Sequence, residues 1–186
     1  MKIQGVMLLI GGILLGLWMA WGLYVIYSTE RPAYEVMQRI SSKVEIRQYE
    51  EQTWISTSYE NDNASFPVLA SYIFGRNEER ENVAMTAPVI TDRKMSFILP
   101  KGISKDNAPT PDGQPIVFTT VPARRLAALS FSWFTSQSRV EKKTAKLLQM
   151  LQKNAIETTG EPFLMRYNDP WTPPFLRRNE VVIEVM

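Results

Sequence analysis

Residues 64–75 read ASFPVLASYIFG, and this stretch decides the class of fold. Four of its apolar side chains share the spacing i, i+3, i+4 and i+7, which marks one face of an α-helix: Phe66, Leu69, Ala70 and Ile73. Gly75 stands where a helix C-cap belongs. The pattern predicts a helix over residues 64–74 whose apolar face packs against another element.

Strand-like segments stand on both sides of this helix. Residues 44–49 and 53–59 alternate apolar with polar or charged side chains, as half-buried antiparallel strands do. After the helix, residues 83–91 and 95–99 predict two more strands, joined by a polar turn at 92–94. This part of the chain therefore predicts the order strand-strand-helix-strand-strand.

The same order recurs after a loop rich in Pro, Gly and Asp at residues 101–115. The predicted elements are strands at 116–121 and 125–131, a helix at 140–155, and strands at 163–167 and 180–185. Ser138 and Glu141 form an S-x-x-E pattern that predicts a capping box for this helix. Its predicted buried stripe consists of Val140, Thr144, Leu147, Leu148 and Leu151. Two such halves predict an α+β domain with two helices laid against a curved antiparallel sheet.

The N-terminal segment differs in character from the rest of the chain. Residues 3–29 carry no charged side chain, and residues 6–27 are almost wholly apolar. About 20 helical residues cross the hydrocarbon core of a bilayer, so this stretch is long enough to span one. Four aromatic side chains gather in its C-terminal half, as at a membrane interface: Trp18, Trp21, Tyr24 and Tyr27. We therefore expect a single-pass transmembrane anchor at residues 1–29 and one soluble domain at residues 30–186.

A cleaved signal peptide is the alternative interpretation of this segment. Lys2 supplies a minimal positive n-region, and residues 20–22 (AWG) form a weak small-x-small site. The apolar run continues beyond that site, which favours an anchor. The basic residues after the span, Arg31, Arg39 and Lys43, do not favour export. A folded domain behind a signal-like start is nevertheless usually exported, so we expect it on the outer (periplasmic or extracytoplasmic) side.

Gly12 and Gly16 form a GxxxG pair within the apolar segment. Such a pair lets two membrane helices approach closely. It therefore offers a dimer contact between two anchors.

The composition excludes most common enzyme sites. The 186 residues include no histidine and no cysteine. A Ser–His–Asp triad, a thiol nucleophile, a histidine-based zinc site and a proximal histidine for haem iron are therefore excluded. The formal net charge is only +2, which gives no electrostatic reason to expect nucleic acid as a partner. We expect a binding protein and not an enzyme.

Five regions in the same order resemble the SOUL/heme-binding protein family. They are residues 34–36 with 44–49 (YEV and VEIRQY), 66–77 (FPVLASYIFGRN), 85–89 (MTAPV), 167–171 (YNDPW) and 177–181 (RRNEV). The resemblance implies a distorted antiparallel β-barrel with two helices, built from two similar halves. It also implies non-covalent binding of haem or related tetrapyrroles, without catalysis.

The resemblance extends only in part to the ligand site. In one branch of the family, the first helix offers methionines and basic residues to haem and its propionates. The matching positions here are Asn63, Phe66, Ala70 and Ser71, and a further basic position corresponds to Pro173. Another branch is credited with a ligating histidine, which this chain lacks. The chain thus keeps an apolar surface for a porphyrin and lacks the basic partners.

An apolar groove along the first helix is the candidate site for haem, protoporphyrin or another flat apolar ligand. Its candidate lining residues are Phe66, Ala70, Tyr72, Ile73 and Phe74. The structural alternative is that Ile73, like Leu69, belongs to the core, as apolar residues at helical spacing usually do.

Two methionines and two tyrosines are the candidate iron ligands in this sequence. Met85 and Met95 offer thioether sulfur, although a strand methionine more often fills space in a core. Tyr72 and Tyr167 offer phenolate, which needs a nearby positive charge to lower a pKa of about 10.

The C-terminal strand supports a different hypothesis. Arg177 and Arg178 beside Glu180 predict either a clamp for a carboxylate or an ion-paired turn that closes the last strand. The family's barrel is similar to that of bacterial effector-binding domains, which capture cationic aromatic drugs with a buried glutamate. In this alternative, Glu180 serves a sensor or carrier of cationic aromatic or lipid-like molecules. A third hypothesis is an interaction protein that kept the fold and lost the ligand.

Overall fold

The computed structural model describes residues 2–58 and 60–186, so Tyr59, the end of the predicted 53–59 strand, lies outside the described residues. In chain order the elements are α1 (Lys2–Ser28), β1 (Tyr34–Ser41), β2 (Val44–Tyr49), β3 (Gln52–Ser58), α2 (Asp62–Ile73), β4 (Val89–Thr91), β5 (Lys94–Ile98), β6 (Val117–Val121), β7 (Arg124–Phe131), α3 (Gln137–Lys153), β8 (Thr158–Arg166), a 3-10 turn η1 (Pro174–Leu176) and β9 (Asn179–Val185). Two strand-strand-helix-strand-strand halves follow β1, which confirms the predicted α+β class.

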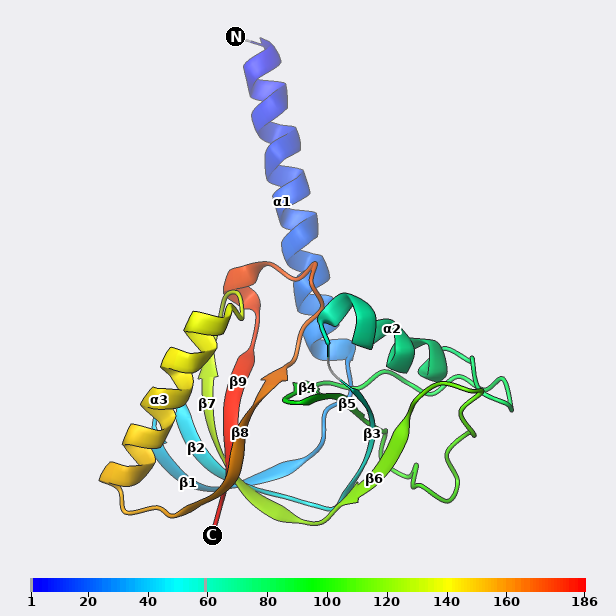
Figure 1. Ribbon diagram of the computed structural model, residues 1–186. Coiled ribbons are helices and arrows are strands. Elements are labelled where there is room, and N and C mark those ends of the chain that lie inside the picture. Colours follow the sequence, from blue (N-terminus) through cyan, green and yellow to red (C-terminus); the bar gives the residue numbers. More distant parts are fainter. Residues whose placement is uncertain (1, 59) are drawn as a thin grey trace.

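The nine strands of the described residues form one antiparallel sheet. Their order is β1-β2-β7-β9-β8-β4-β5-β3-β6. The sheet curves strongly without closing, and β1 and β6 are its edges (Figure 1). The two halves of the sequence intermingle in the sheet, because β2 pairs with β7 and β4 pairs with β8.

Each helix packs against its own part of the sheet. The inward side of α3 presents Leu147 and Leu151, which are fully buried in one core with residues of β2, β7 and β9. The inward side of α2 presents Leu69 and Ile73 to a second core with β3 and β5. A third core lies inside the curve of the sheet, between the first two cores. The apolar periodicity therefore predicted the buried sides of both helices, except that Phe66, on the predicted face of α2, is 37% exposed.

Three local predictions were wrong. Residues 83–88 do not form the predicted strand and β4 begins only at Val89. The reason is that their backbone N–H groups donate to other parts of the chain: that of Val83 to Ile73 O, and that of Ala87 to Glu30 O. The predicted capping box is not formed, because α3 begins at Gln137 with Ser136 as N-cap, which places Ser138 inside the first turn. Leu148 is not part of the buried stripe and is 37% exposed, since it lies about 100° around the helix from Leu147.

α1 is one continuous apolar helix that projects from the domain (Figure 1). Residues Val6–Ser28 are long and apolar enough to cross a membrane, as a signal sequence near the N-terminus would also be. Gly12 and Gly16 have open space around them. After the helix, the chain is held against the domain: the Lys101 N–H donates to a Glu30 carboxylate oxygen over 3.0 Å.

Candidate ligand-binding cavity

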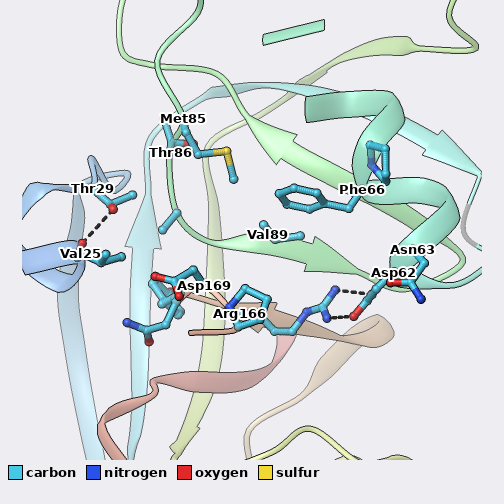
Figure 2. A pocket seen from close by; sticks show the side chains of 15 residues that line it. Val25, Thr29, Asp62, Asn63, Phe66, Met85, Thr86, Val89, Arg166 and Asp169 are labelled. Carbon is cyan, nitrogen blue, oxygen red and sulfur yellow. Dashed lines mark hydrogen bonds and ion pairs between the residues drawn. The ribbon is translucent and has the colours of Figure 1, made fainter. Parts of the chain in front are cut away.

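A cavity of about 430 Å³ lies where α1 meets the domain. Four segments line it: the end of α1 with the residue after it, the first turns of α2, the segment 85–89 before and into β4, and the segment 166–170 from the last residue of β8 onward (Figure 2). Cavities of roughly 300–1,000 Å³ hold drug-sized ligands in proteins. The size therefore suits a small organic molecule.

One wall of the cavity is apolar. Phe66 and Pro67 come from α2, and Met85, Ala87 and Val89 come from the opposite segment. The Phe66 ring stacks at a tilt on the core ring of Phe97, with centroids 5.3 Å apart, and remains 37% exposed. The core thus fixes one side of the Phe66 ring and leaves the other for a ligand.

The rim of the cavity carries more acidic than basic groups. Arg166 is its one basic lining residue among those described, and Asp62 and Asp169 are acidic. The Arg166 guanidinium donates to both carboxylate oxygens of Asp62 and, over 2.9 Å, to Thr91 Oγ1. Asp169 accepts the backbone N–H groups of residues 171 and 172. The positive charge at the rim is therefore already compensated.

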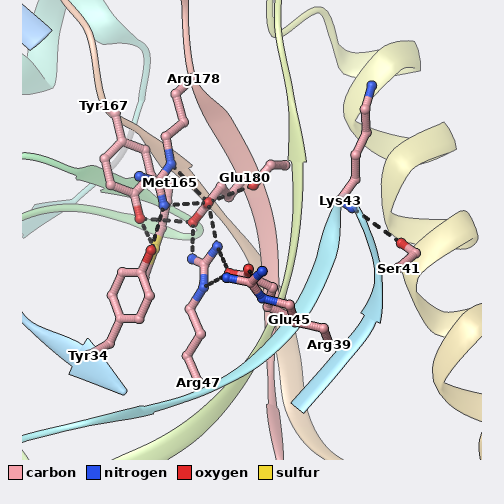
Figure 3. Close-up of polar contacts among 11 residues, drawn as sticks. Tyr34, Arg39, Ser41, Lys43, Glu45, Arg47, Met165, Tyr167, Arg178 and Glu180 are labelled. Carbon is pink, nitrogen blue, oxygen red and sulfur yellow. Dashed lines mark hydrogen bonds and ion pairs between the residues drawn. The ribbon is translucent and has the colours of Figure 1, made fainter. Parts of the chain in front are cut away.

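A buried polar network shares one residue, Tyr167, with the lining of this cavity, and Figure 3 shows its contacts. Tyr167 lines the cavity, and its hydroxyl donates to Glu180 Oε2 over 2.8 Å. Arg47 donates to both carboxylate oxygens of Glu180, over 2.8 and 3.1 Å. Arg178 donates twice to Oε1, over 3.0 and 2.8 Å, and Ser130 once, over 2.8 Å. All the donors converge on one fully buried carboxylate.

The charges of this network decide the protonation of Glu180. Burial alone would raise the pKa of the Glu180 carboxyl, but the hydrogen bonds and charge of Arg47 and the charge of Arg178 lower it to about 2. Glu180 is therefore ionised at neutral pH. Two guanidinium groups face one carboxylate, so the network carries no uncompensated negative charge.

The two tyrosines considered as iron ligands stay protonated. Burial, and then the charge of Glu180, raises the pKa of Tyr167 well above 10. Burial and the charge of Glu79 raise the pKa of Tyr72 to about 12, and the Tyr72 hydroxyl donates to Pro109 O over 2.7 Å. Neither environment favours the phenolate that would bind iron.

The sequence profile of the SOUL heme-binding protein family matches residues 29–184, which is nearly the whole chain after α1. This chain belongs to that family. No curated protein sequence matches it. Its SOUL domain keeps the family's antiparallel sheet and two helices, as the resemblance of the five segments implied.

Solved structures share this fold at low sequence identity. The C-terminal domain of EcmrR is similar with a TM-score of 0.58 and 13% identity over 82% of this chain and 98% of that domain. A hydrolase from Listeria innocua has a TM-score of 0.52 and 10% identity, with coverage of 86% and 94%. An uncharacterized conserved protein from Listeria innocua has a TM-score of 0.52 and 9% identity, with coverage of 77% and 92%. At such identity these likenesses show the fold alone.

The residues of the SOUL domain fit the porphyrin plane better than the iron or the propionates of haem. The apolar wall suits a flat ring. The lining offers one sulfur donor, Met85, and a phenol, Tyr167, that already donates to Glu180. The one guanidinium at the rim, that of Arg166, is paired with Asp62. Haem would therefore gain little from this donor set beyond burial of its ring.

The structure brings only some of the predicted site residues together. Phe66, Met85 and Asn63 line the cavity. Four predicted residues are instead buried in the core near α2, namely Ala70, Tyr72, Ile73 and Met95. Phe74 is 67% exposed just beyond the helix and is not among the residues that line the cavity.

The remaining candidates belong to other contacts. The Ser71 hydroxyl donates to Val68 O within its own helix. Arg178 pairs with Glu180, whereas Arg177 donates to the carbonyls of Pro170 and Thr172.

Sequence reasoning missed two groups of residues at this site. It did not find the partners of Glu180 at positions 47 and 130, which lie on other strands. It also did not find Val25 of α1 and Thr29 just after it, which were assigned to the anchor alone. No signal in the sequence marked Arg47, which stands at a polar position in the alternation of β2 and is nevertheless buried.

Proposed function

We propose that this protein is a non-catalytic, membrane-tethered binding module that holds a tetrapyrrole or similar flat apolar ligand non-covalently in the cavity. The observation that carries the proposal is the apolar wall of Phe66, Pro67, Met85 and Val89 in a member of the SOUL heme-binding family. Burial of apolar surface contributes about 25 cal/mol per Å² before ordering costs. A porphyrin face pressed on this wall would bind in the micromolar range without an iron ligand.

The iron of haem should add little to the affinity of this site. Because the lining offers no imidazole or thiolate, protoporphyrin IX should bind about as tightly as haemin. The test is a titration of the full-length chain in detergent micelles, with haemin followed by absorbance and protoporphyrin IX by fluorescence. Dissociation constants within tenfold of each other support the proposal. A hundredfold preference for haemin, about 2.7 kcal/mol, would require a real iron ligand and would overturn it.

The absence of catalysis is also part of the proposal. Without histidine or cysteine, the hydroxyl groups of the chain lack the usual activating bases. The buried carboxylate of Glu180 accepts hydrogen bonds from two arginines, one serine and one tyrosine. A hydrolase shares the fold, but at 10% identity that likeness carries no activity.

A second candidate is a carrier or sensor of cationic aromatic or lipid-like molecules. The observation that favours it is the charge of the rim, where Asp62 and Asp169 outnumber Arg166. Glu180 does not supply this charge, since its guanidinium partners compensate it. The same titration includes rhodamine 6G as a cationic dye. Tighter binding of the dye than of both porphyrins favours this candidate, and binding of none favours an interaction protein without a ligand.

The tether itself is a further part of the proposal. α1 would span the bilayer once, with residues 30–186 on the outer side and Gly12 and Gly16 available for contact with a second anchor. Protease added to spheroplasts, which lack the outer-membrane barrier, should then degrade the domain and leave a membrane-protected fragment of α1.

A further inference from the structure

The loop at residues 169–176 packs directly on the membrane-spanning part of α1. The indole Nε1 of Trp18 donates to the carbonyl of Trp171 over 2.6 Å. One turn further along, Gly22 lies so close to Pro173 that an added methyl group would clash with the proline ring. The loop therefore stands beside the helix at the level of residues 18–22.

The length of α1 gives the depth of this level in a bilayer. The apolar span begins at Val6, and about 20 residues cross the hydrocarbon core. That count ends near Val25, seven residues after Trp18, which at about 1.5 Å per residue corresponds to roughly 10 Å. If the span began at Ile3, the depth of Trp18 would still be about 6 Å. A loop bound beside Trp18 cannot stay clear of the lipid.

Exposed aromatic side chains surround this loop. Trp171 is 75% exposed, and Trp133, Phe134 and Phe175 are each about half exposed. The Trp133 N–H donates to Pro174 O over 2.8 Å, which joins the turn before α3 to the loop. Trp133 adopts a positive φ of 77°, a strained conformation for a tryptophan, while its ring stays outside the core. Tryptophan and phenylalanine in such a cluster favour the boundary between headgroups and acyl chains.

The backbone N–H and C=O groups of residues 170–174 in the loop have hydrogen-bond partners within the protein. Pro170, Pro173 and Pro174 have no N–H group, and Asp169 accepts the N–H groups of Trp171 and Thr172. Each carbonyl from 170 to 174 accepts a hydrogen bond from Arg177, Trp18, Leu176 or Trp133. Unpaired backbone groups are what make an irregular loop costly in lipid. Residues 170–174 therefore carry no unpaired backbone group that would make their insertion into lipid costly.

We propose that residues 169–176, together with Trp133 and Phe134, insert into the headgroup–acyl boundary of the bilayer that α1 spans. The inference rests on the proposed tether. Insertion would fix the domain against the lipid surface instead of leaving it on a free linker. Asp169 and Pro170 also line the cavity, so the ligand site would lie at the lipid boundary.

Nitroxide labels on the full-length chain in phosphatidylcholine vesicles test this inference. The chain has no cysteine, so a single introduced cysteine is labelled uniquely. The test positions are Trp171→Cys and, as a second site, Phe134→Cys. Met186→Cys is the matched aqueous control, because it is 70% exposed and lies at the end of the domain away from α1 (Figure 1). Leu14→Cys is the control for the tether.

Collisions with oxygen and with a water-soluble nickel chelate report the depth of each label. Labels at 171 and 134 should show an oxygen-to-nickel collision ratio at least fivefold higher than the label at 186. A ratio at 171 and 134 equal to that at 186, with a label at 14 buried in lipid, would overturn the inference and leave the tether intact. A water-exposed label at 14 would overturn both.

Discussion

The guanidinium of Arg47 and the carboxylate of Glu180 form a bidentate ion pair across 133 residues of sequence, with donor–acceptor distances of 2.8 and 3.1 Å. Arg47 lies on β2 and Glu180 on β9, with β7 between them in the sheet. Both side chains are buried. The pair therefore joins β2 to β9 across β7, and so links the two halves of the chain beside the candidate cavity.

Glu180→Gln should destabilise the protein strongly. The change removes a buried negative charge, which takes from Arg178 its carboxylate partner and leaves Arg47 paired only with the partly exposed Glu45. Breaking a buried ion pair in this way costs about 3–5 kcal/mol. Glu184→Gln on the same strand is the matched control, because its 3.3 Å pair with Arg124 is partly exposed and should contribute about 0–1 kcal/mol. Urea unfolding of the full-length chain in micelles measures both values, and equal losses would contradict the role assigned to Glu180.

The stability of the folded domain should fall in acid. The pKa of Glu180 is about 2 in the folded protein, against 4.5 for an unperturbed glutamate. A lowered folded-state pKa stabilises the protein above the unfolded pKa, and this contribution is lost as the pH falls from about 4.5 to about 2. Unfolding free energies measured at a series of pH values should show this slope for the natural chain. In Glu180→Gln that part of the slope should be absent, and an unchanged slope would assign the acid sensitivity to other carboxyl groups.

Leu147→Ala should cost about 2–5 kcal/mol of unfolding free energy, because Leu147 is fully buried between α3 and the sheet. The neighbouring Leu148→Ala is the control with identical chemistry. Leu148 is 37% exposed, and its truncation should cost less than about 1 kcal/mol. Thermal or urea unfolding distinguishes the two. A loss below about half a kcal/mol for Leu147→Ala would place that side of α3 at the surface.

Phe66→Ala should weaken the binding of both protoporphyrin IX and haemin by about tenfold or more, which corresponds to about 1.4 kcal/mol. The reason is that the Phe66 ring forms part of the apolar wall of the cavity. Phe74→Ala removes the same ring from the exposed end of the same helix and should leave both affinities unchanged. Fluorescence titration of the two variants checks this, and equal effects would move the ligand away from the cavity.

Met85→Leu should leave the absorbance spectrum of bound haemin unchanged. Met85 supplies the one thioether of the cavity lining, and the proposed site holds the porphyrin by its ring instead of by iron. Leucine keeps the apolar volume and removes the sulfur. A shift of the Soret band in Met85→Leu, with binding of protoporphyrin IX unaffected, would identify Met85 as an iron ligand.

Local pattern was sufficient to predict the helices of this fold and eight of the nine described strands, whereas β1 (Tyr34–Ser41) was not predicted from it. The spacing of Leu69 and Ile73, or of Leu147 and Leu151, depends only on the 3.6-residue period of a helix, so the sequence carries it directly. The alternation in the strands and the uninterrupted apolar run of α1 are equally local. The exact start of α3 and the path of residues 83–88 were not predictable in this way. Both depend on backbone partners, such as Glu30 for Ala87, that are remote in sequence.

The sequence by itself determined the α+β class, the two halves, the apolar N-terminal helix and the absence of any imidazole or thiolate ligand. Only the tertiary structure decided which residues meet. It assigned Tyr72 and Ile73 to the core and brought Phe66 and Met85 to a cavity completed by α1. It also paired Glu180 with arginines from two different segments. The physical reason is that periodicity fixes which side of an element is buried, whereas charge compensation and cavity shape depend on how the elements pair in the sheet.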